Sequence, residues 1–194
     1  MAPGKIILVT GGARSGKSEV AEQLADAYSG RVTYLATAGV YDDEMSHRVE
    51  KHRERRPNHW VTVEETHWLA RALMAVPQGS CVLVDCLTLW ITNLLLDESL
   101  PPQGAVETDQ EEYIISETVR VLETARSREL MLILVSNQVG CGVVPDNRLG
   151  RLFRDVAGRV NRQVAALADR VYLVTAGIPV ELKSLAAKIG REEI

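Results

Sequence analysis

Short runs of β-branched and apolar residues alternate along the chain with longer stretches whose apolar residues recur at helical spacing. The short runs predict strands at residues 5–9, 32–36, 81–85, 130–136 and 171–175. Most of these runs are apolar throughout, which is typical of strands covered on both faces in a parallel sheet. Residues 177–180 contain a proline, so they predict a turn into a short strand at the edge of that sheet.

The longer stretches predict helices at residues 18–27, 44–55, 68–74, 87–96, 111–127 and 147–167. Because β-α-β crossovers are right-handed, these elements predict a three-layer α/β domain with a mostly parallel sheet. Ligands of such a domain bind at the carboxyl ends of the strands. Residues 97–108, which contain two prolines and a glycine, are expected to form a flexible loop, and the charged tail after Lys183 is expected to fray.

Length and composition favour one domain over residues 1–194. The chain has 194 residues, of which 46% are hydrophobic, so it can bury a sizeable core. The formal net charge of −4 argues against binding of nucleic acid through a basic surface. The apolar runs are too short for a signal-peptide core or for the roughly 18 residues of a membrane span. We therefore expect a cytoplasmic protein with no membrane span and no nucleic-acid partner.

The cysteines fit a reducing compartment. Cys81, Cys86 and Cys141 form no C-x-x-C pair, and their odd number suits free thiols. Each is expected to be a small buried hydrophobic residue.

A glycine-rich segment follows the first predicted strand directly and precedes the first predicted helix. It matches G-x-x-x-x-G-K-[ST] with the residues Gly11, Gly12, Ala13, Arg14, Ser15, Gly16, Lys17 and Ser18. The alternative is a glycine-rich turn with an exposed lysine, but the strand–loop–helix context predicts a phosphate-binding loop. Glycines let backbone N–H groups wrap a phosphate, and the helix start adds unpaired donors and partial positive charge. Lys17 is then expected to reach the β- and γ-phosphates of a nucleotide, and Ser18 to bind Mg²⁺.

Asp85 ends an apolar strand, which is the form of a Walker B element. The carboxyl ends of parallel strands share one edge of the sheet, so Asp85 is expected beside the phosphate loop, where it would bind Mg²⁺. An aspartate that ends a strand is also a common helix cap. The phosphate loop favours the metal role.

The motifs of a GTPase switch are missing from the expected places. Residues 137–140 read Asn-Gln-Val-Gly and do not match N-K-x-D, and Leu87 and Thr88 follow Asp85 where D-x-x-G would be required. A transferase that moves part of a nucleotide is therefore favoured over a timer switch.

Residues 42–57 combine acids at one end with arginines at the other. This order suits the dipole of a helix, and Pro57 would end it. Met45, Val49 and His52 would share one face of that helix. A solvated, charge-rich helix whose histidine packs incidentally is the alternative.

The charges around His52 favour a chemical role for this residue. Lys51, Arg53, Arg55 and Arg56 disfavour the imidazolium, which leaves a ring nitrogen free to attack. The same cations would stabilise the charge on a nucleotide phosphate under attack. His52 is therefore the candidate nucleophile for covalent transfer of a nucleotidyl group.

The chain resembles the family of bifunctional adenosylcobinamide kinases/adenosylcobinamide-phosphate guanylyltransferases. Beyond the phosphate loop, the resemblance rests on residues 34–38, 42–45 with Arg48 and His52-Arg53, 85–88 with Asn93, 136–140, 144–148, 153–155 and 157–161. These motifs cover nearly the whole chain in order, so the resemblance is far more specific than the phosphate loop alone.

The resemblance implies a RecA-like P-loop NTPase fold, a homotrimer and two reactions. Members phosphorylate the hydroxyl of the aminopropanol arm of adenosylcobinamide with ATP or GTP. They then attack GTP with a histidine and pass GMP to the new phosphate, which gives adenosylcobinamide-GDP. His52 matches that histidine.

The resemblance also implies a set of guanine-nucleotide contacts. These are Ala36, Thr37, Ala38, Arg53, Glu54, Arg55, Arg56, Glu64 and Asp85. Glu64 suits a base reader, because a carboxylate accepts hydrogen bonds from N1–H and the exocyclic amine of guanine. A plain surface acid is the alternative for Glu64.

A polar group at the start of the last long helix has two possible roles. Asn147, Arg148, Arg154 and Asp155 would form a subunit contact or part of the corrinoid site. A helix cap at Asp146 followed by plain surface charge is the alternative.

Two other functions remain open on the sequence alone. A monofunctional P-loop kinase would use Lys17, Ser18 and Asp85 in the same way, with His52 merely structural. A non-catalytic, nucleotide-dependent assembly protein would bind nucleotide without turning over any corrinoid.

Overall fold

The computed structural model describes residues 4–39, 57–105 and 109–187. Their strands form one seven-stranded sheet in the order β3-β2-β4-β5-β1-β6-β7. Strands β1 to β6 are parallel, and β7 pairs with β6 in the antiparallel direction. The strands are β1 Ile6–Gly11, β2 Val32–Ala36, β3 Val61–Glu64, β4 Cys81–Asp85, β5 Met131–Asn137, β6 Arg170–Thr175 and β7 Ile178–Glu181.

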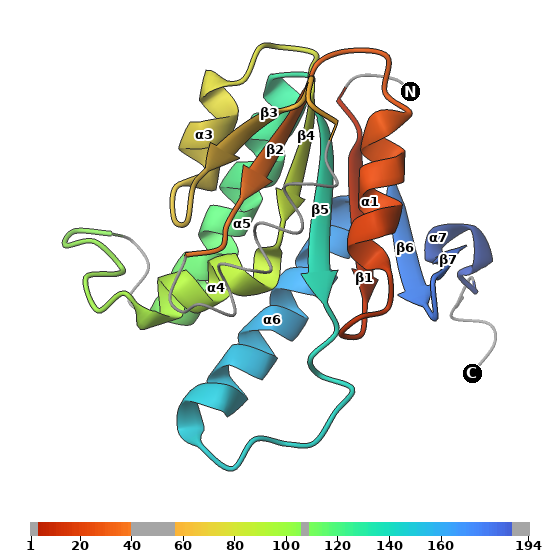
Figure 1. Ribbon diagram of the computed structural model, residues 1–194. Helices are drawn as coiled ribbons and strands as arrows, with labels where there is room; N and C mark the ends of the chain where they lie inside the picture. The colour runs from red at the N-terminus through yellow and green to blue at the C-terminus, as the bar shows by residue number, and fades with distance from the viewer. Residues whose placement is uncertain (1–3, 40–56, 106–108, 188–194) are drawn as a thin grey trace, which may run out of the picture.

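Helices cover both faces of this sheet (Figure 1). They are α1 Lys17–Asp26, α3 Leu69–Ala75, α4 Leu87–Leu96, α5 Gln110–Ser127, α6 Arg148–Leu167 and the short α7 Leu182–Leu185. Helix α1 lies on one face, whereas α3, α4, α5 and α6 lie on the other. This is the predicted three-layer α/β fold.

Alternate residues of the inner strands supply the two halves of the core. On β1, Ile7 and Val9 pack with α1, whereas Ile6 and Leu8 pack with the helices of the opposite face. Because successive side chains of a strand point to opposite faces, both sets must be apolar when both faces are covered. The continuous apolar runs of the sequence have this cause.

The elements agree closely with the sequence patterns. The predictions for β2, β4 and α4 match to the residue, and the other long elements differ by one or two residues at their ends. The predicted proline-containing edge strand is confirmed as β7. The predicted helix at 44–55 lies outside the described residues.

Two short elements were not predicted. Strand β3 has only four residues, and most of its side chains are exposed, because it forms the edge of the sheet. The expectation that the chain frays after Lys183 is wrong for Ser184 and Leu185. These residues lie in α7, where the Glu181 carboxylate accepts hydrogen bonds from the backbone N–H groups of Lys183 and Ser184.

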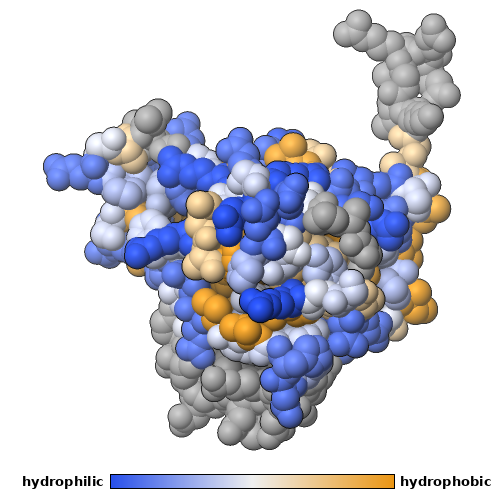
Figure 2. Space-filling view, turned by 90° about the horizontal axis from the view of Figure 1, so that it is seen from above, coloured by the Kyte–Doolittle hydropathy of each residue, from blue (hydrophilic) through white to orange (hydrophobic). Residues whose placement is uncertain are grey.

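The two edges of the sheet differ. At the carboxyl edge, α6 begins well beyond the strands and runs back along them (Figure 1). The edge at which the strands begin is mainly hydrophilic, with small scattered apolar patches (Figure 2). No helix of the described residues is both long and apolar enough to cross a membrane.

Candidate nucleotide-binding site

The phosphate loop joins β1 to α1 in the predicted place. A Cβ atom on Gly11 would lie 2.4 Å from the carbonyl oxygen of Val174, so only glycine fits there. Gly16, at the N-cap of α1, has a φ of 91°, in the left-handed region that glycine adopts without strain. The backbone N–H of Gly177 donates to the carbonyl of Ser15 at 2.8 Å. The loop is therefore fixed between the first helix and the β6–β7 turn.

Lys17 reaches back across this loop. Its Nζ donates a hydrogen bond to the carbonyl oxygen of Gly12 at 3.1 Å, and the residue is only 8% exposed. The alternative of a turn with an exposed lysine is therefore wrong. The ammonium group is held at the concave side of a loop whose backbone donors and helix start both favour an anion.

The strand register aligns the other predicted residues with the loop. Glu64, Ala36, Asp85, Val135 and Val9 form one row across five neighbouring strands. Asp85 is two strand spacings from β1, roughly 10 Å, and Glu64 is four spacings away, roughly 19 Å. The Asp85 carboxylate thus lies between the phosphate loop and Glu64 along the carboxyl edge.

A tyrosine orients the Asp85 carboxylate. The hydroxyl of Tyr34, from the neighbouring strand β2, donates to Asp85 Oδ2 at 2.8 Å. The N-cap of α4 is Cys86, so Asp85 is not the cap of that helix and this alternative is wrong. The bond from Tyr34 fixes the Oδ2 atom of this carboxylate. A carboxylate oxygen and the hydroxyl of Ser18 are the hard oxygen ligands that Mg²⁺ prefers, so these residues fit the ion.

Thr37 connects the ends of β2 and β4. Its hydroxyl accepts a hydrogen bond from the Cys86 N–H at 2.7 Å and donates to the Cys86 carbonyl at 2.8 Å. Its own carbonyl accepts from Asn93 Nδ2 at 2.9 Å. Thr37 is fully buried, and its side chain holds the end of β2 against the residue that follows β4. Ala36 is also buried, and Ala38 is partly exposed beside it.

A second polar chain lies under the phosphate loop. Asn137, which ends β5 beside Gly11, donates through Nδ2 to the hydroxyl of Thr88 at 2.8 Å. Thr88 in turn lies 3.0 Å from the sulfur of Cys86. Neither these bonds nor the Tyr34 bond was predicted. The position of Asn137 at the end of an apolar strand is the only signal in the sequence for these bonds. Which residue each side chain meets depends on the order of the strands in the sheet.

The cysteines divide by burial. Burial raises the pKa of Cys81 to about 12, and burial together with the Asp85 charge raises that of Cys86 to about 11. Both thiols are therefore neutral at pH 7 and unreactive. The expectation for Cys141 is wrong, because it is exposed in the loop before α6.

The polar start of α6 has a cap, but not the one suggested by the sequence. Asn147 is the N-cap, and its Oδ1 accepts a hydrogen bond from the Gly150 N–H at 2.7 Å. Asp146 does not cap the helix. Arg154 and Asp155 form an ion pair with each other at 3.2 Å, and Arg148 is exposed.

The remaining predicted site residues divide into two groups. Glu64 is exposed at the carboxyl end of β3, next to Ala36. His52, Arg53, Glu54, Arg55 and Arg56 lie outside the described residues. The described part of the site is thus the phosphate loop, Asp85 with its supports, and Glu64 at one end.

The sheet order, the phosphate loop and the strand-ending Asp85 define a P-loop nucleotide-binding protein. One further strand, β5, separates the loop strand from the Asp85 strand, as in RecA-like proteins. The chain belongs to the family described as cobinamide kinase / cobinamide phosphate guanyltransferase, whose model matches residues 7–182.

The relatives are similar along almost their whole length. The bifunctional adenosylcobalamin biosynthesis protein CobU of Escherichia coli (strain K12) is 44% identical over 185 residues, which are 92% of this chain and 99% of the relative. The bifunctional protein CobP of Pseudomonas aeruginosa is 44% identical over 177 residues, 91% of this chain and 96% of the relative.

A solved structure shares the fold alone. It is an ATPase from the type III secretion system of pathogenic bacteria, with a TM-score of 0.56 and 11% identity. The match covers 96% of this chain but only 59% of the ATPase.

Proposed function

We propose that this protein phosphorylates adenosylcobinamide with ATP or GTP and then transfers GMP from GTP to the phosphate, giving adenosylcobinamide-GDP. The observation that carries the proposal is the family match over residues 7–182 on a chain whose phosphate loop is formed. The two reactions together assemble the nucleotide end of a cobalamin precursor.

In the first reaction the hydroxyl oxygen of the aminopropanol arm attacks the γ-phosphorus. The bond between this phosphorus and the β,γ-bridging oxygen breaks, the nucleoside diphosphate leaves, and the hydroxyl loses its proton. Lys17 and the N–H groups of residues 11–18 bind the phosphates and stabilise their charge. Mg²⁺ held by Ser18 and Asp85 would neutralise further phosphate charge, and Tyr34 and Thr37 keep this edge in place.

In the second reaction a ring nitrogen of His52 attacks the α-phosphorus of GTP, and pyrophosphate leaves. A phosphate oxygen of the corrinoid phosphate then attacks the same phosphorus, so the P–N bond breaks and the histidine is restored. The cations Arg53, Arg55 and Arg56 would stabilise the charge in both steps. Glu64 would read guanine, with Ala36, Ala38, Glu54 and Asp85 as further contacts.

We also propose that the protein is a homotrimer. Helix α6 begins beyond the sheet (Figure 1). This projecting end supports a contact between copies, because Val143, Val144 and Leu149 are exposed there. Asn147, Arg148, Arg154 and Asp155 lie on the same part of the chain.

Replacing Lys17 tests the shared phosphate site. Lys17→Ala removes the cation of the loop, so both corrinoid phosphorylation and GMP transfer should fall at least about a hundredfold. The measurement is chromatography of the corrinoid products after incubation with ATP or GTP. The control is Lys5→Ala, which directly precedes β1 at the opposite edge of the sheet from the phosphate loop and should keep full activity. Normal turnover by Lys17→Ala would refute the assignment of the loop.

A further inference from the structure

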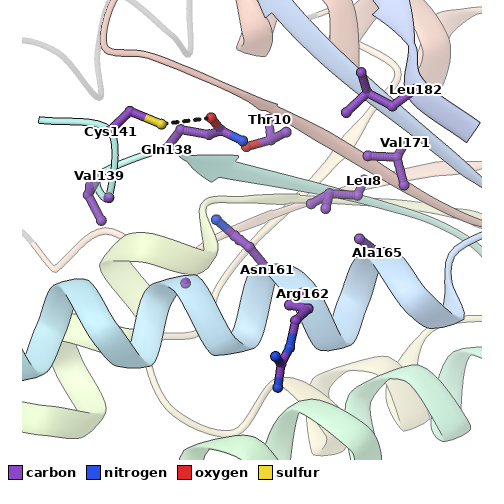
Figure 3. A pocket seen from close by; sticks show the side chains of 12 residues that line it. Leu8, Thr10, Gln138, Val139, Cys141, Asn161, Arg162, Ala165, Val171 and Leu182 are labelled. Atoms are coloured by element: carbon purple, nitrogen blue, oxygen red, sulfur yellow. Dashed lines mark hydrogen bonds between the residues drawn. The ribbon is translucent and has the colours of Figure 1, made fainter. Parts of the chain in front are cut away.

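A cavity of about 320 Å³ lies between the sheet and α6, on the face opposite α1 (Figure 3). Strands β1 and β6 form its wall through Leu8, Thr10 and Val171, and α6 closes it with Asn161 and Ala165. The loop after β5, which contains Gln138, borders its open end. None of the functions assigned above uses this cavity.

The lining suits a neutral ligand. It is mostly apolar, with leucine, valine and alanine side chains at the end nearest α7 and neutral polar groups at the other. Among the described residues, Arg162 is the only charged one that lines it, and its guanidinium points away from the strands (Figure 3). A phosphate would therefore find no cation inside, whereas an uncharged group on an aliphatic stem would match both ends.

One buried hydroxyl in the wall has no partner. Thr10 is 3% exposed, and its Oγ1 makes no hydrogen bond with any described residue. Asn161 beside it is already engaged, because its Oδ1 accepts from Ser136 Oγ at 2.6 Å and its Nδ2 donates to the Asn137 carbonyl. Buried polar groups are normally satisfied. Thr10 thus offers a donor and an acceptor to an occupant of the cavity.

The polar end lies next to the phosphate loop. Thr10 directly precedes Gly11, and the Gln138 N–H donates to the Gly11 carbonyl at 2.9 Å. A molecule bound in this cavity would lie on the face of the sheet opposite α1, and it would extend to the carboxyl edge near the phosphate loop. A second hollow lies between α3 and α5, near the start of the strands and away from this edge.

We propose that this cavity binds a carboxamide-bearing arm at the rim of the corrinoid acceptor. The inference rests on the function proposed above and adds where the corrinoid is held. The rim of cobinamide carries methyl groups and neutral carboxamides on short aliphatic stems. The stem packs against Leu8, Ala165 and Val171, and the carboxamide exchanges hydrogen bonds with Thr10 Oγ1 in the wall at the polar end. The ring itself stays outside, above the carboxyl edge.

Steady-state rates at varied adenosylcobinamide and saturating ATP test this site. Thr10→Val removes the hydroxyl at constant shape and should raise the KM for the corrinoid about three- to tenfold, the share of one neutral hydrogen bond. Thr10→Ser keeps the hydroxyl and should restore a near-normal KM. Ala165→Leu fills the cavity from α6 and should raise the same KM about tenfold or more. Its matched control is Ala166→Leu, because Ala166 is the exposed neighbour on the same helix.

Labelling of each variant with GTP alone gives the second readout, since it needs no corrinoid. A rise in corrinoid KM with far smaller change in this labelling supports the proposal. An unchanged corrinoid KM in both Thr10→Val and Ala165→Leu overturns it, as does an equal loss of labelling, which would mean a damaged loop. Turnover of corrinoid by the wild-type protein upholds the proposed function whatever these variants do. Its absence refutes that function and this inference together.

Discussion

At the scale of single residues, hydrogen bonds that involve side chains hold the groups at the carboxyl edge of the sheet in place. Lys17 is held by Gly12, Asp85 by Tyr34, and Cys86 by the hydroxyl of Thr37. A charged group that is fixed before the substrate arrives needs no reorganisation during the reaction. Tyr34 is therefore a positioning residue for Asp85.

Replacing Tyr34 by Phe tests this role. The ring still fills the core beside α1, so the free energy of unfolding should change by no more than about 1.5 kcal/mol, the value of one hydrogen bond. Without the bond to Oδ2, Asp85 is less well oriented, and kcat for corrinoid phosphorylation should fall about three- to tenfold. The Mg²⁺ concentration required for half-maximal rate should rise in parallel.

Tyr172→Phe is the matched control, because the Tyr172 hydroxyl accepts a hydrogen bond from Arg170 on β6, remote from Asp85. It should leave kcat and the Mg²⁺ requirement unchanged. Wild-type values for Tyr34→Phe would show that this hydroxyl does not position Asp85.

The sequence predicted those site residues that a local motif identifies. Lys17 and Ser18 follow from the loop pattern, and Asp85 from its place at the end of an apolar strand. It did not predict their supports. Tyr34 reaches Asp85 only because β2 and β4 are neighbours, and Asn137 lies beside Gly11 only because β5 pairs with β1. Strand order is a tertiary property, and a single sequence does not encode it in local spacing.

At the scale of elements, the strands and helices that are well buried could be predicted from the sequence, whereas the exposed elements β3 and α7 could not. Strands β2 and β4 are buried on both faces and read as continuous apolar runs, so their bounds match. Strand β3 lies at an edge with mostly exposed side chains, so its sequence pattern is weak. Helix α7 begins from a side-chain cap by Glu181 rather than from an apolar stripe, and no periodicity marks it.

The Glu181 carboxylate should make the C-terminal elements sensitive to acid. Hydrogen bonds from the Val171 N–H and from the start of α7 lower the pKa of Glu181 below its ordinary value of 4.5. A lowered folded-state pKa stabilises the protein above about pH 4.5, and this contribution is lost as the pH falls through the folded-state pKa. Urea unfolding should therefore show wild type more stable than Glu181→Gln at neutral pH, with the difference shrinking in acid.

The expected result is a difference in urea midpoint that is largest near neutral pH and declines as the pH falls below the ordinary pKa of 4.5. A constant difference at every pH would mean that the charge on Glu181 contributes nothing. A Glu181→Gln protein that is as stable as wild type at neutral pH would show that the negative charge adds nothing to the cap, because the glutamine oxygen can still accept the hydrogen bonds.

At the scale of the whole molecule, the projecting start of α6 exposes apolar side chains in the described part of the chain. Val143 is 93% exposed, and Val144 and Leu149 are also exposed on the same projection. Apolar groups gathered in this way mark interaction surfaces. The proposed trimer would bury them.

Leu149→Glu tests this contact, because a charge buried in an interface without a partner is costly. Light scattering coupled to size-exclusion chromatography should give the mass of a trimer for wild type and a smaller mass for Leu149→Glu. The matched control is Leu167→Glu at the other end of α6, where the side chain is similarly exposed; it should remain trimeric. A monomeric wild type, or a trimeric Leu149→Glu protein, would contradict the proposed contact.

The central claim of the proposed function is that a histidine beside the phosphate loop carries GMP from GTP to the corrinoid phosphate. The most direct measurement is peptide-mapped mass spectrometry of the protein after incubation with GTP and Mg²⁺. We expect the mass of one guanylyl group on the peptide that contains His52, and no such mass in His52→Ala, which should still phosphorylate adenosylcobinamide. A guanylyl group on another residue, its persistence in His52→Ala, or its complete absence from the wild-type protein would contradict the account.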